Sequence, residues 1–416
     1  MEIHFLFTEH IPLERLGWLS KSFDKGGNSI NLNAKTSEAA IDISQFGLFL
    51  TGDALFSLID KRYRPYWKKL ISVDNFFCNL DSEEIKLLGL ECKERKKLDI
   101  ETELNNTEIH SNTILQRDSD FWNGLLNSIH NQFNGNRIGL LEFQGPYMSR
   151  TTVNALRLLE KAIDYKLDPE LYTYLDGIHM GHIGQKPSEY ENIGKKLRYL
   201  EKKARMNDLR FIMLSCSRCG TARGYIREKK EKEYFQSDDV IPHYLFCNLN
   251  KIVERFEENN LILSASCGIV QYCNDFDKDK LNKKKASKIK PPIIIFITHN
   301  PYGSEWTFGG LSFAMACANH EIPTKVVFIE DGTYNLPTEH KLSSEDKMFN
   351  IQDIILATSD MEFLEYYVLD ESLKIRNFDL VNKLNNYIEK INNIELTRLI
   401  ISKQDNSITH KRIIFF

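Results

Sequence analysis

The sequence predicts an α/β protein built from three tandem units, each a parallel β-sheet covered by helices on both faces. Three observations support this fold class. Short apolar runs alternate with stretches whose apolar residues recur at helical spacing. Strand–helix–strand alternation with connections of this length implies parallel sheets. Two short motifs recur at a constant offset, and a chain of 416 residues has room for several cores.

The internal repeat is carried by two motif pairs, a Pro-Tyr loop and an Asp-Gly loop, each of which follows an apolar run. Pro301 lies 155 residues after Pro146. Asp331 likewise lies 155 residues after Asp176. Because both motifs keep one offset with no gap between them, we interpret the two regions as copies of one unit. The motifs are GPYMS (145–149), NPYGS (300–304), LDGIH (175–179) and EDGTY (330–334).

These patterns place the first unit at residues 1–130, the second at 135–270 and the third at 291–416. Two polar, aperiodic stretches support the cuts, one at residues 91–112 and one in the lysine-rich linker at 274–290. The linker has no core pattern and runs into two prolines, so a solvated connector is favoured over an RNA-contacting patch.

The elements of the second unit follow in order along the chain. RIGLLEF predicts the first strand and LYTYL the second, and LILSA (261–265) closes the unit. Apolar residues at helical spacing predict one helix between the first two strands and another before the strand that starts at Phe211. The first unit is a looser copy, in which IHFLF (3–7) and FGLFLTGDAL (46–55) predict the first two strands.

Composition and charge argue against several classes of protein. The formal net charge of −4 gives no basic field, so direct contact with nucleic acid is not expected. No apolar run approaches the ~20 residues that span a bilayer. The start, MEIHFLFTEH, lacks the features of a secretory signal, and eight cysteines are sparse for this length. Reduced thiols in a cytoplasmic protein are therefore expected.

The stretch FIMLSCSRCGTARGY (211–225) carries the strongest chemical signal. An apolar strand runs directly into a Cys-x-x-Cys loop, which opens a helix that carries Arg223. A thiol at Cys216 or Cys219 would face free helix N–H groups, with Arg218 as a second positive neighbour, and these favour the thiolate. We expect the Cys216 sulfur to be open to solvent and able to attack sulfur or hold a persulfide.

Two further loops are expected at the same edge of the second sheet. In a parallel sheet, ligands bind outside the carboxyl ends of the strands. The loops QGPYMSR, DGIHMGH and CSRCGTAR follow successive strands. Because neighbouring strands lie only ~5 Å apart, we expect these loops to converge on one crevice. The side chains concerned, besides the two cysteines, are Tyr147, Ser149, His179 and His182.

Other interpretations of the cysteines stay open. The pair can be inert core residues, since free Cys is among the most buried residue types. His179, His182, Cys216 and Cys219 can supply four zinc ligands, in which case the protein is a non-enzymatic binding scaffold. A redox dithiol of the thioredoxin kind is a third interpretation. Cys78 follows the strand-like NFF, but the acidic stretch after it opposes a thiolate, so a sulfur role competes with core packing.

The residues that recur in both copies are interpreted as architectural. Asp176 and Asp331 each precede a glycine, which predicts a turn where Asp bonds its own backbone and Gly takes a positive φ. Tyr147 and Tyr302 occupy the same place in the Pro-Tyr loops, and we interpret them as loop anchors.

These motifs resemble the DsrE/DsrF/DsrH family of sulfur-relay proteins, whose members include TusB, TusC and TusD. The second unit, with GPYMS, LDGIH and CSRCGTARG each after a strand, is similar to DsrE and TusD. The third unit is similar to the DsrF and TusC branch and has ATSDMEF (357–363), without cysteine, where its third strand is expected to end. The first unit takes the DsrH or TusB place.

The resemblance implies a sulfurtransferase or sulfur carrier in which Cys216 accepts sulfane sulfur as a persulfide and passes it to a partner. Cys219 matches a second cysteine found in many DsrE-like sequences, and Arg223 would help to stabilise the anion. The implied partners are a TusA-like donor and a TusE- or DsrC-like acceptor, in tRNA thiolation or sulfur oxidation, with no organic cofactor. Since three separate subunits assemble and then pair in related systems, this chain is expected to replace the trimer and to form a homodimer.

Overall fold

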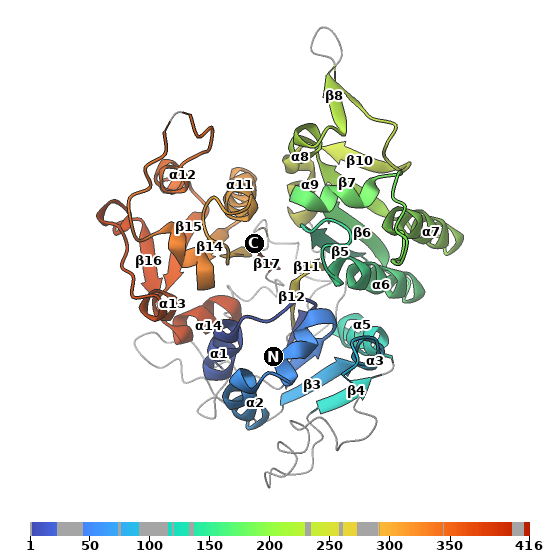
Figure 1. Cartoon of the computed structure of the whole chain (residues 1–416), viewed down its shortest axis with the longest axis horizontal. Coiled ribbons are helices and arrows are strands. Elements are labelled where there is room, and N and C mark those ends of the chain that lie inside the picture. The colour runs from blue at the N-terminus through green and yellow to red at the C-terminus, as the bar shows by residue number, and fades with distance from the viewer. Residues whose placement is uncertain are drawn as a thin grey trace, which may run out of the picture.

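The computed structural model describes twelve stretches of the chain, and within them the fold is three five-stranded sheets and one two-stranded hairpin, with helices packed around them (Figure 1). The described residues contain no helix that is both long and apolar enough to cross a membrane. The described residues do not include the stretch 91–112, the linker at 274–289, Cys92 or Cys273. The stretches are 2–22, 45–73, 76–90, 115–118, 120–132, 137–228, 234–257, 261–272, 290, 292–343, 345–401 and 412–416.

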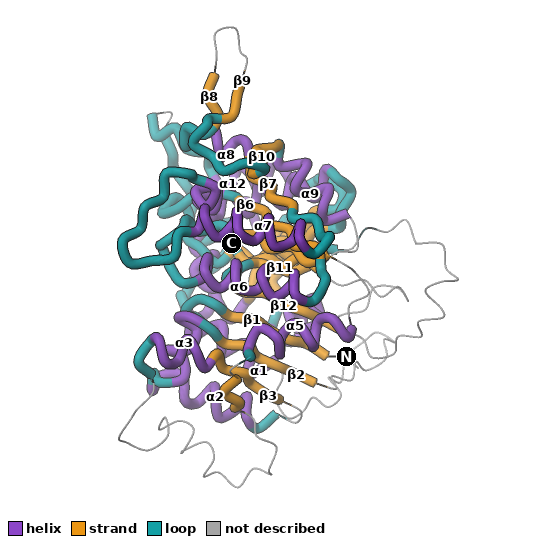
Figure 2. Tube along the Cα trace, turned by 90° about the vertical axis from the view of Figure 1, so that its right-hand side faces the viewer, coloured by secondary structure: helices purple, strands orange, loops and turns teal. Residues whose placement is uncertain are grey.

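The second sheet is entirely parallel, as predicted, with the strand order β10-β7-β6-β5-β11. Its strands are β5 (Arg137–Glu142), β6 (Asp168–Thr173), β7 (Ile212–Cys216), β10 (Tyr244–Cys247) and β11 (Leu261–Ser264). Its helices are α6 (Thr151–Asp164), the 3₁₀ helix η3 (Leu175–Gly181), α7 (Ile193–Met206), α8 (Ser217–Ala222) and α9 (Leu249–Glu257). The hairpin of β8 (Ile226–Glu228) and β9 (Tyr234–Gln236) projects beyond this sheet (Figure 2).

The third sheet repeats this arrangement, with the order β16-β15-β14-β13-β17 and every pair parallel. Its strands are β13 (Ile293–Ile297), β14 (Thr324–Phe328), β15 (Leu364–Leu369), β16 (Ile388–Ile391) and β17 (Arg412–Phe415). Its helices are α11 (Trp306–Asn319), η4 (Glu330–Asn335), α12 (Ile351–Thr358), α13 (Asp370–Ile375), η5 (Asn382–Leu384) and α14 (Asn393–Ile401).

The third strand of this sheet does not end where the sequence predicted. Residues 357–363 hold the end of α12 and a turn, and β15 follows them. The apolar run before residue 357 forms a helix because Asn350 caps it, accepting hydrogen bonds from the N–H groups of Gln352 and Asp353. The residue at the end of the third strand is therefore Leu369, which still places no cysteine there.

The first sheet has the order β12-β1-β2-β3-β4. Its strands are β1 (Glu2–Phe7), β2 (Gln45–Leu50), β3 (Phe76–Asp81), β4 (Leu115–Asp118) and β12 (Cys267–Tyr272). Its helices are α1 (Leu13–Ser22), η1 (Gly52–Leu58), η2 (Lys61–Tyr63), α2 (Arg64–Ile71), α3 (Ser82–Leu87) and α5 (Phe121–Gln132).

One strand of the first sheet departs from the predicted parallel arrangement. β12 begins two residues after β11, and it pairs antiparallel with β1. Its first residue, Cys267, lies opposite Phe7 at the carboxyl end of β1. The chain therefore enters the first sheet beside the carboxyl end of β1, and β12 runs in the opposite direction to β1. The two residues between β11 and β12 are too few for the long crossover that a parallel strand needs. The stretch 135–270, predicted as one unit, thus contains part of a strand that completes another sheet.

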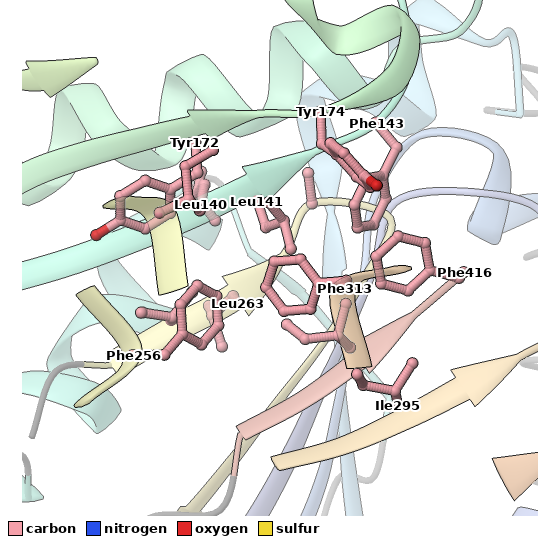
Figure 3. Close-up of a cluster of buried hydrophobic side chains, with 14 of the residues drawn as sticks. Leu140, Leu141, Phe143, Tyr172, Tyr174, Phe256, Leu263, Ile295, Phe313 and Phe416 are labelled. Carbon is pink, nitrogen blue, oxygen red and sulfur yellow. The ribbon is translucent and has the colours of Figure 1, made fainter. Parts of the chain in front are cut away.

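The three sheets meet at their fifth strands. β11, β12 and β17 contact one another in the middle of the molecule (Figure 1). Aromatic side chains from the second and third sheets fill the space beside them, where Phe416 lies 4.3 Å from Phe143 and 5.9 Å from Phe313 between ring centroids (Figure 3). All three rings are buried, so the second and third sheets share one hydrophobic core.

Candidate functional site

Cys216 lies at the carboxyl edge of the second sheet, where β7 ends and α8 begins. Its backbone is extended (φ −65°, ψ 119°), and it is the residue that caps α8. A hydrogen bond from the Cys219 thiol lowers the pKa of Cys216, and the backbone N–H groups of Cys219 and Arg218 and the charge of Arg218 act in the same direction. Burial opposes them, and the pKa of Cys216 falls to about 7. The predicted anion-stabilising surroundings are therefore present.

Cys219 has the opposite character. Its hydrogen bond to Cys216 and its burial raise its pKa well above the ordinary value of a thiol. The hydrogen bond between the two thiols therefore lowers the pKa of Cys216 and raises that of Cys219.

The predicted exposure of Cys216 is wrong. Only 2% of its surface is exposed, and for Cys219 the exposed fraction is 7%. The α8 residues beside the thiols pack against α11 of the third sheet, where the Arg218 guanidinium lies 5.0 Å from the centre of the Phe308 ring. The expectation considered the loop after β7 alone, and α8 also packs against η3, β8 and β10.

Arg223 joins the second sheet to the third. Its guanidinium donates from Nε to Asp176 Oδ1 and from Nη2 to Glu305 Oε2, both at 2.8 Å. Its charge lowers the pKa of Cys219, while Arg218 is the arginine among the leading causes of the low pKa of Cys216. Arg223 therefore holds the edge of the site in place, and a direct effect on the Cys216 anion stays a prediction.

The predicted turn chemistry of the Asp-Gly loops is also wrong. Asp176 accepts a hydrogen bond from Arg223, and the positive φ angles lie one residue earlier, at Leu175 (51°) and Glu330 (53°). The glycines are required by close approach. A Cβ atom on Gly177 would lie 2.3 Å from the Glu142 carbonyl oxygen, and one on Gly332 would lie 1.9 Å from that of Ile297.

The two histidines do not join the cysteines. His179 Nδ1 lies 2.8 Å from the Tyr225 hydroxyl, and His182 Nδ1 donates to the Asp239 carbonyl oxygen at 3.2 Å. Across the stretches that the structure describes, no three or more His, Cys, Asp or Glu side chains lie together as a set able to hold a metal ion. The zinc site that the sequence allowed at His179, His182, Cys216 and Cys219 is therefore not formed.

The Pro-Tyr loops are anchored by their tyrosines, as predicted. The Tyr147 hydroxyl donates to Gln185 Oε1 at 2.8 Å, and the Tyr302 hydroxyl lies 2.8 Å from His340 Nδ1. Both tyrosines have positive φ angles, 72° and 63°. Ser149, which was expected to point toward the cysteines, donates to Gln144 Oε1 at 2.5 Å.

Cys78 does not occupy the place that corresponds to Cys216. It is the third residue of β3 and is fully buried, in register with residue 48 of β2 and residue 115 of β4. Burial raises its pKa, so it is a core thiol and the sulfur role considered for it is not supported. The residue at the end of β3 is Asp81, whose carboxylate accepts hydrogen bonds from the N–H groups of Glu83 and Glu84.

The turn after the third strand recurs in all three sheets, which sequence reasoning missed. Each strand ends at the residue before a short helix, and a residue with positive φ follows the helix. The signal that finds the second and third copies is an Arg seven residues after the strand's last residue, followed directly by Gly or Asn. The equivalent sets are Asp81, Glu84 and Gly89 in the first sheet, Cys216, Cys219 and Gly224 in the second, and Leu369, Ser372 and Asn377 in the third.

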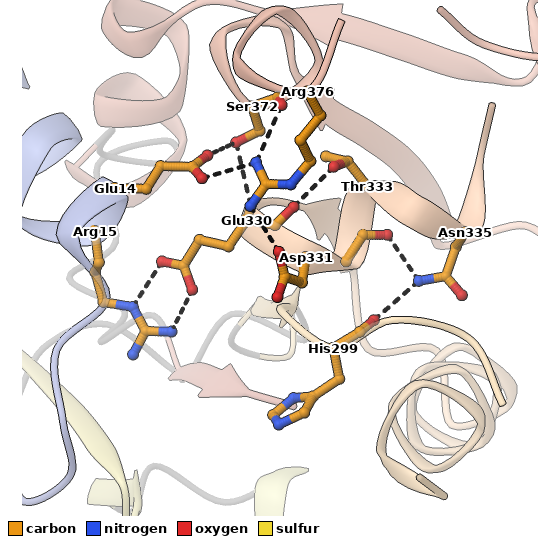
Figure 4. Close-up of polar contacts among 10 residues, drawn as sticks. Glu14, Arg15, His299, Glu330, Asp331, Thr333, Asn335, Ser372 and Arg376 are labelled. Atoms are coloured by element: carbon orange, nitrogen blue, oxygen red, sulfur yellow. Dashed lines mark hydrogen bonds and ion pairs between the residues drawn. The ribbon is translucent and has the colours of Figure 1, made fainter. Parts of the chain in front are cut away.

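Arg376 occupies the place of Arg223 at the junction between the third and first sheets (Figure 4). It donates to Asp331 Oδ1 and to Glu14 Oε2, both at 2.8 Å. Beside it, Arg15 makes a bidentate pair with Glu330, at 2.9 and 2.8 Å. A cavity of about 460 Å³ lies between these groups. Leu369 replaces Cys216 in this copy. The thiol beside Arg15 at this junction is Cys267, and burial raises its pKa.

Sequence reasoning also missed a third thiol at the site. Cys247 is the last residue of β10 and pairs in register with Cys216 on the adjacent strand β7. No spacing pattern in the sequence indicates this neighbour, because 30 residues and a hairpin separate the two positions. Strand order alone brings them together.

Comparisons with known proteins gave one family match and a match to a solved structure. Residues 292–409 match the family model of the DsrE/DsrF-like family, a range that holds most of the third sheet and excludes Cys216. The ychN protein from E.coli, a solved structure, is 21% identical with a TM-score of 0.25, and the match covers 31% of this chain and 98% of that one. No curated protein matches. Residues 292–409 of this chain are therefore similar to the DsrE/DsrF-like family.

Proposed function

We propose that the protein is a sulfur carrier that holds sulfane sulfur as a persulfide on Cys216 and passes it to a partner protein. The DsrE/DsrF-like match supports a sulfur-relay role for the chain. The observation that carries the assignment to Cys216 is the pKa of its thiol. Among the cysteines that the structure describes, Cys216 has a lowered pKa, and those with raised values are Cys78, Cys219, Cys247, Cys267 and Cys317.

The proposed chemistry is one displacement at sulfur. The Cys216 thiolate attacks the outer sulfur of a donor persulfide, a bond forms between Cys216 Sγ and that sulfur, and the donor leaves as its thiolate. The terminal sulfur of the new persulfide is anionic near neutral pH, and the positive charge of Arg218 stabilises it. Cys219 keeps its proton throughout, because its pKa is raised.

Access to Cys216 is the second part of the proposal. With 2% of the residue exposed, a donor persulfide reaches the sulfur only when the elements packed around α8 move apart. On the side of the third sheet, α8 is held by Arg218 stacked on Phe308 and by Arg223 paired to Glu305. Such contacts contribute about 1 kcal/mol or less each, so a local movement of α8 that leaves the shared core intact costs little free energy.

We propose that residues 1–130, 135–270 and 291–416 are three fused units that together replace a three-subunit assembly, and that two chains pair as a homodimer. The common strand order of the three sheets supports the fusion. The proposed partners are a TusA-like donor and a TusE- or DsrC-like acceptor in the cytoplasm, in tRNA thiolation or sulfur oxidation. In this role the first and third sheets hold the thiol site of the second sheet in position. They also provide surfaces to which the partner proteins bind.

Intact-mass analysis after incubation with a persulfide donor tests the proposal. The wild-type chain is expected to gain about 32 Da, the mass of one sulfur atom, and Cys216→Ser is expected to lose that adduct. Cys78→Ser is the control, because Cys78 is a core thiol with a raised pKa, and this variant should load normally. An undiminished adduct on Cys216→Ser refutes the assignment.

A further inference from the structure

Cys247 is placed to react with Cys216. The two are in-register partners at the ends of parallel strands, and such residues present their side chains to the same face of the sheet. Neighbouring strands lie about 4.8 Å apart, which is within the Cα separation of about 4.4–6.8 Å over which two cysteines can bond. The negative charge of Cys216 also raises the pKa of Cys247, after burial, which is the larger cause. The two sulfurs are therefore close enough to interact.

Cys247 is also the most accessible thiol of the group. Cys216 and Cys219 are buried, whereas Cys247 is half-buried. Every other cysteine within the described residues is buried as well. Two residues near Cys247 are exposed, Leu245 on its strand (56% exposed) and Asn248 next to it. A partner protein can therefore reach this thiol without the opening that Cys216 requires.

We infer that Cys247 is a relay thiol, which takes the sulfane sulfur from the Cys216 persulfide and presents it at the surface to the acceptor protein. This inference rests on the proposed function and adds a second sulfur-carrying residue to it. It gives the buried persulfide a route outward along the edge of one sheet, from the end of β7 to the end of β10.

The transfer step balances without an oxidant or reductant. Cys247 Sγ loses its proton and forms a bond to the outer sulfur of the Cys216 persulfide. The bond between that sulfur and Cys216 Sγ breaks, its electron pair stays on Cys216, and the released proton is taken up there. Cys216, with a pKa of about 7, is a good leaving thiolate. Cys247, with a pKa of about 11, is the stronger nucleophile once it is deprotonated.

Site mapping of the sulfur tests the inference on the full chain. The protein is loaded with a low-molecular-mass alkyl persulfide, trapped by alkylation at successive times and mapped by peptide mass. We expect sulfur first on Cys216 and then on Cys247, with none on Cys247 in Cys216→Ser. In Cys247→Ser, sulfur stays on Cys216 and passes to a thiol-bearing acceptor protein at least about tenfold more slowly. Leu245→Ser, an exposed position on the same strand, is the matched control and should transfer at the wild-type rate.

The outcomes separate the two proposals. If Cys216 loads but wild-type Cys247 never carries sulfur, or Cys247→Ser transfers normally, the relay is refuted and the proposed function stands. Loading of Cys247 at the wild-type rate in Cys216→Ser also refutes the relay. If Cys216 never loads, the proposed function fails and the relay with it.

A second measurement needs no persulfide. In a Cys219→Ser background, mild oxidation with diamide is expected to form a Cys216–Cys247 disulfide, detected as a cross-linked peptide pair. Failure to form it while both thiols alkylate freely shows that the sulfurs do not meet, and it overturns the inference.

Discussion

Arg223 and Arg376 make the same two ion pairs in different sheets. Each binds the aspartate of its own sheet's second-strand loop and a glutamate at the start of the next sheet's first helix, all at 2.8 Å. At the junction between the first and second sheets the charges are exchanged. The arginine, Arg150, precedes the first helix of the second sheet, α6, and the glutamate, Glu84, lies on α3 after the third strand of the first sheet, with Arg150 Nε 3.0 Å from Glu84 Oε2. An arginine–glutamate ion pair therefore links each sheet to the next in a closed ring. The thiols Cys216 and Cys219 lie at the junction between the second and third sheets.

Replacing Cys219 by alanine is expected to raise the pKa of Cys216 by about 1. The hydrogen bond from Cys219 is the largest cause of the low pKa, and a hydrogen bond to a charged group is worth about 1.5–3 kcal/mol. The rate of Cys216 alkylation rises with pH as the thiolate forms, with a midpoint near 7 in the wild type. Cys219→Ser keeps a hydroxyl donor and should stay closer to the wild-type midpoint. An unshifted midpoint in Cys219→Ala contradicts the role of Cys219 as donor.

Replacing Arg15 by methionine is expected to destabilise the protein by about 3–5 kcal/mol, because it leaves the carboxylate of Glu330 buried without its partner. Denaturant unfolding measures the change. Lys21→Met is the matched control, since Lys21 lies on the same helix and also pairs across to the third sheet, with Glu371 at 2.8 Å, but both side chains are exposed. That change should cost less than about 1 kcal/mol. Equal losses would show that burial of the Arg15 pair is unimportant.

Stability is expected to fall as the pH rises from about 5 to 8, partly because of Glu142. Burial raises the pKa of this carboxyl from an ordinary value of 4.5 to about 8. Between these values the unfolded chain has lost the proton that the folded chain keeps, so the free energy of unfolding falls by up to about 1.4 kcal/mol per pH unit. Glu142→Gln should flatten the decline, measured by denaturant unfolding at several pH values, while Glu362→Gln at an exposed position should not. A variant with the wild-type slope rules out Glu142 as a cause.

Replacing Gly332 by alanine is expected to destabilise the protein by about 3 kcal/mol or more, since the new Cβ would lie 1.9 Å from the Ile297 carbonyl oxygen and force the two loops apart. Gly145→Ala is the control, because its nearest neighbour would be an ordinary contact at 3.6 Å. The free energy of unfolding in denaturant gives both values. Tolerance of alanine at residue 332 would mean that the two loops are farther apart than the structure has them.

Local patterns predicted much of the second and third sheets. The constant offset of the Pro-Tyr and Asp-Gly loops located equivalent strand ends, and the anchoring tyrosines followed from it. The apolar run before Cys216 and the helix after it predicted the backbone hydrogen bonds that help to lower its pKa, but not the larger effect of the Cys219 thiol. These features depend on residues close together in the sequence, where strand and helix periodicity is informative.

The features that the sequence did not predict depend on contacts between distant parts of the chain. Cys216 is buried in a region where Phe308 and Glu305, more than 80 residues away, pack against its helix. Cys247 reaches Cys216 through strand order, which has no spacing signature. The helix before residue 357 looked like a strand because a short apolar run has no period long enough to separate the two.

The antiparallel strand β12 has a consequence for synthesis of the chain. The open edge of β1 is paired only when β12 has been synthesised, because Phe7 pairs with Cys267, 260 residues later in the chain. On the ribosome, the amino-terminal sheet emerges with free N–H and C=O groups along that edge, while the next sheet forms behind it. Its completion is therefore tied to translation of the second sheet, and a nascent chain stalled between the two is the species that most needs protection by a chaperone.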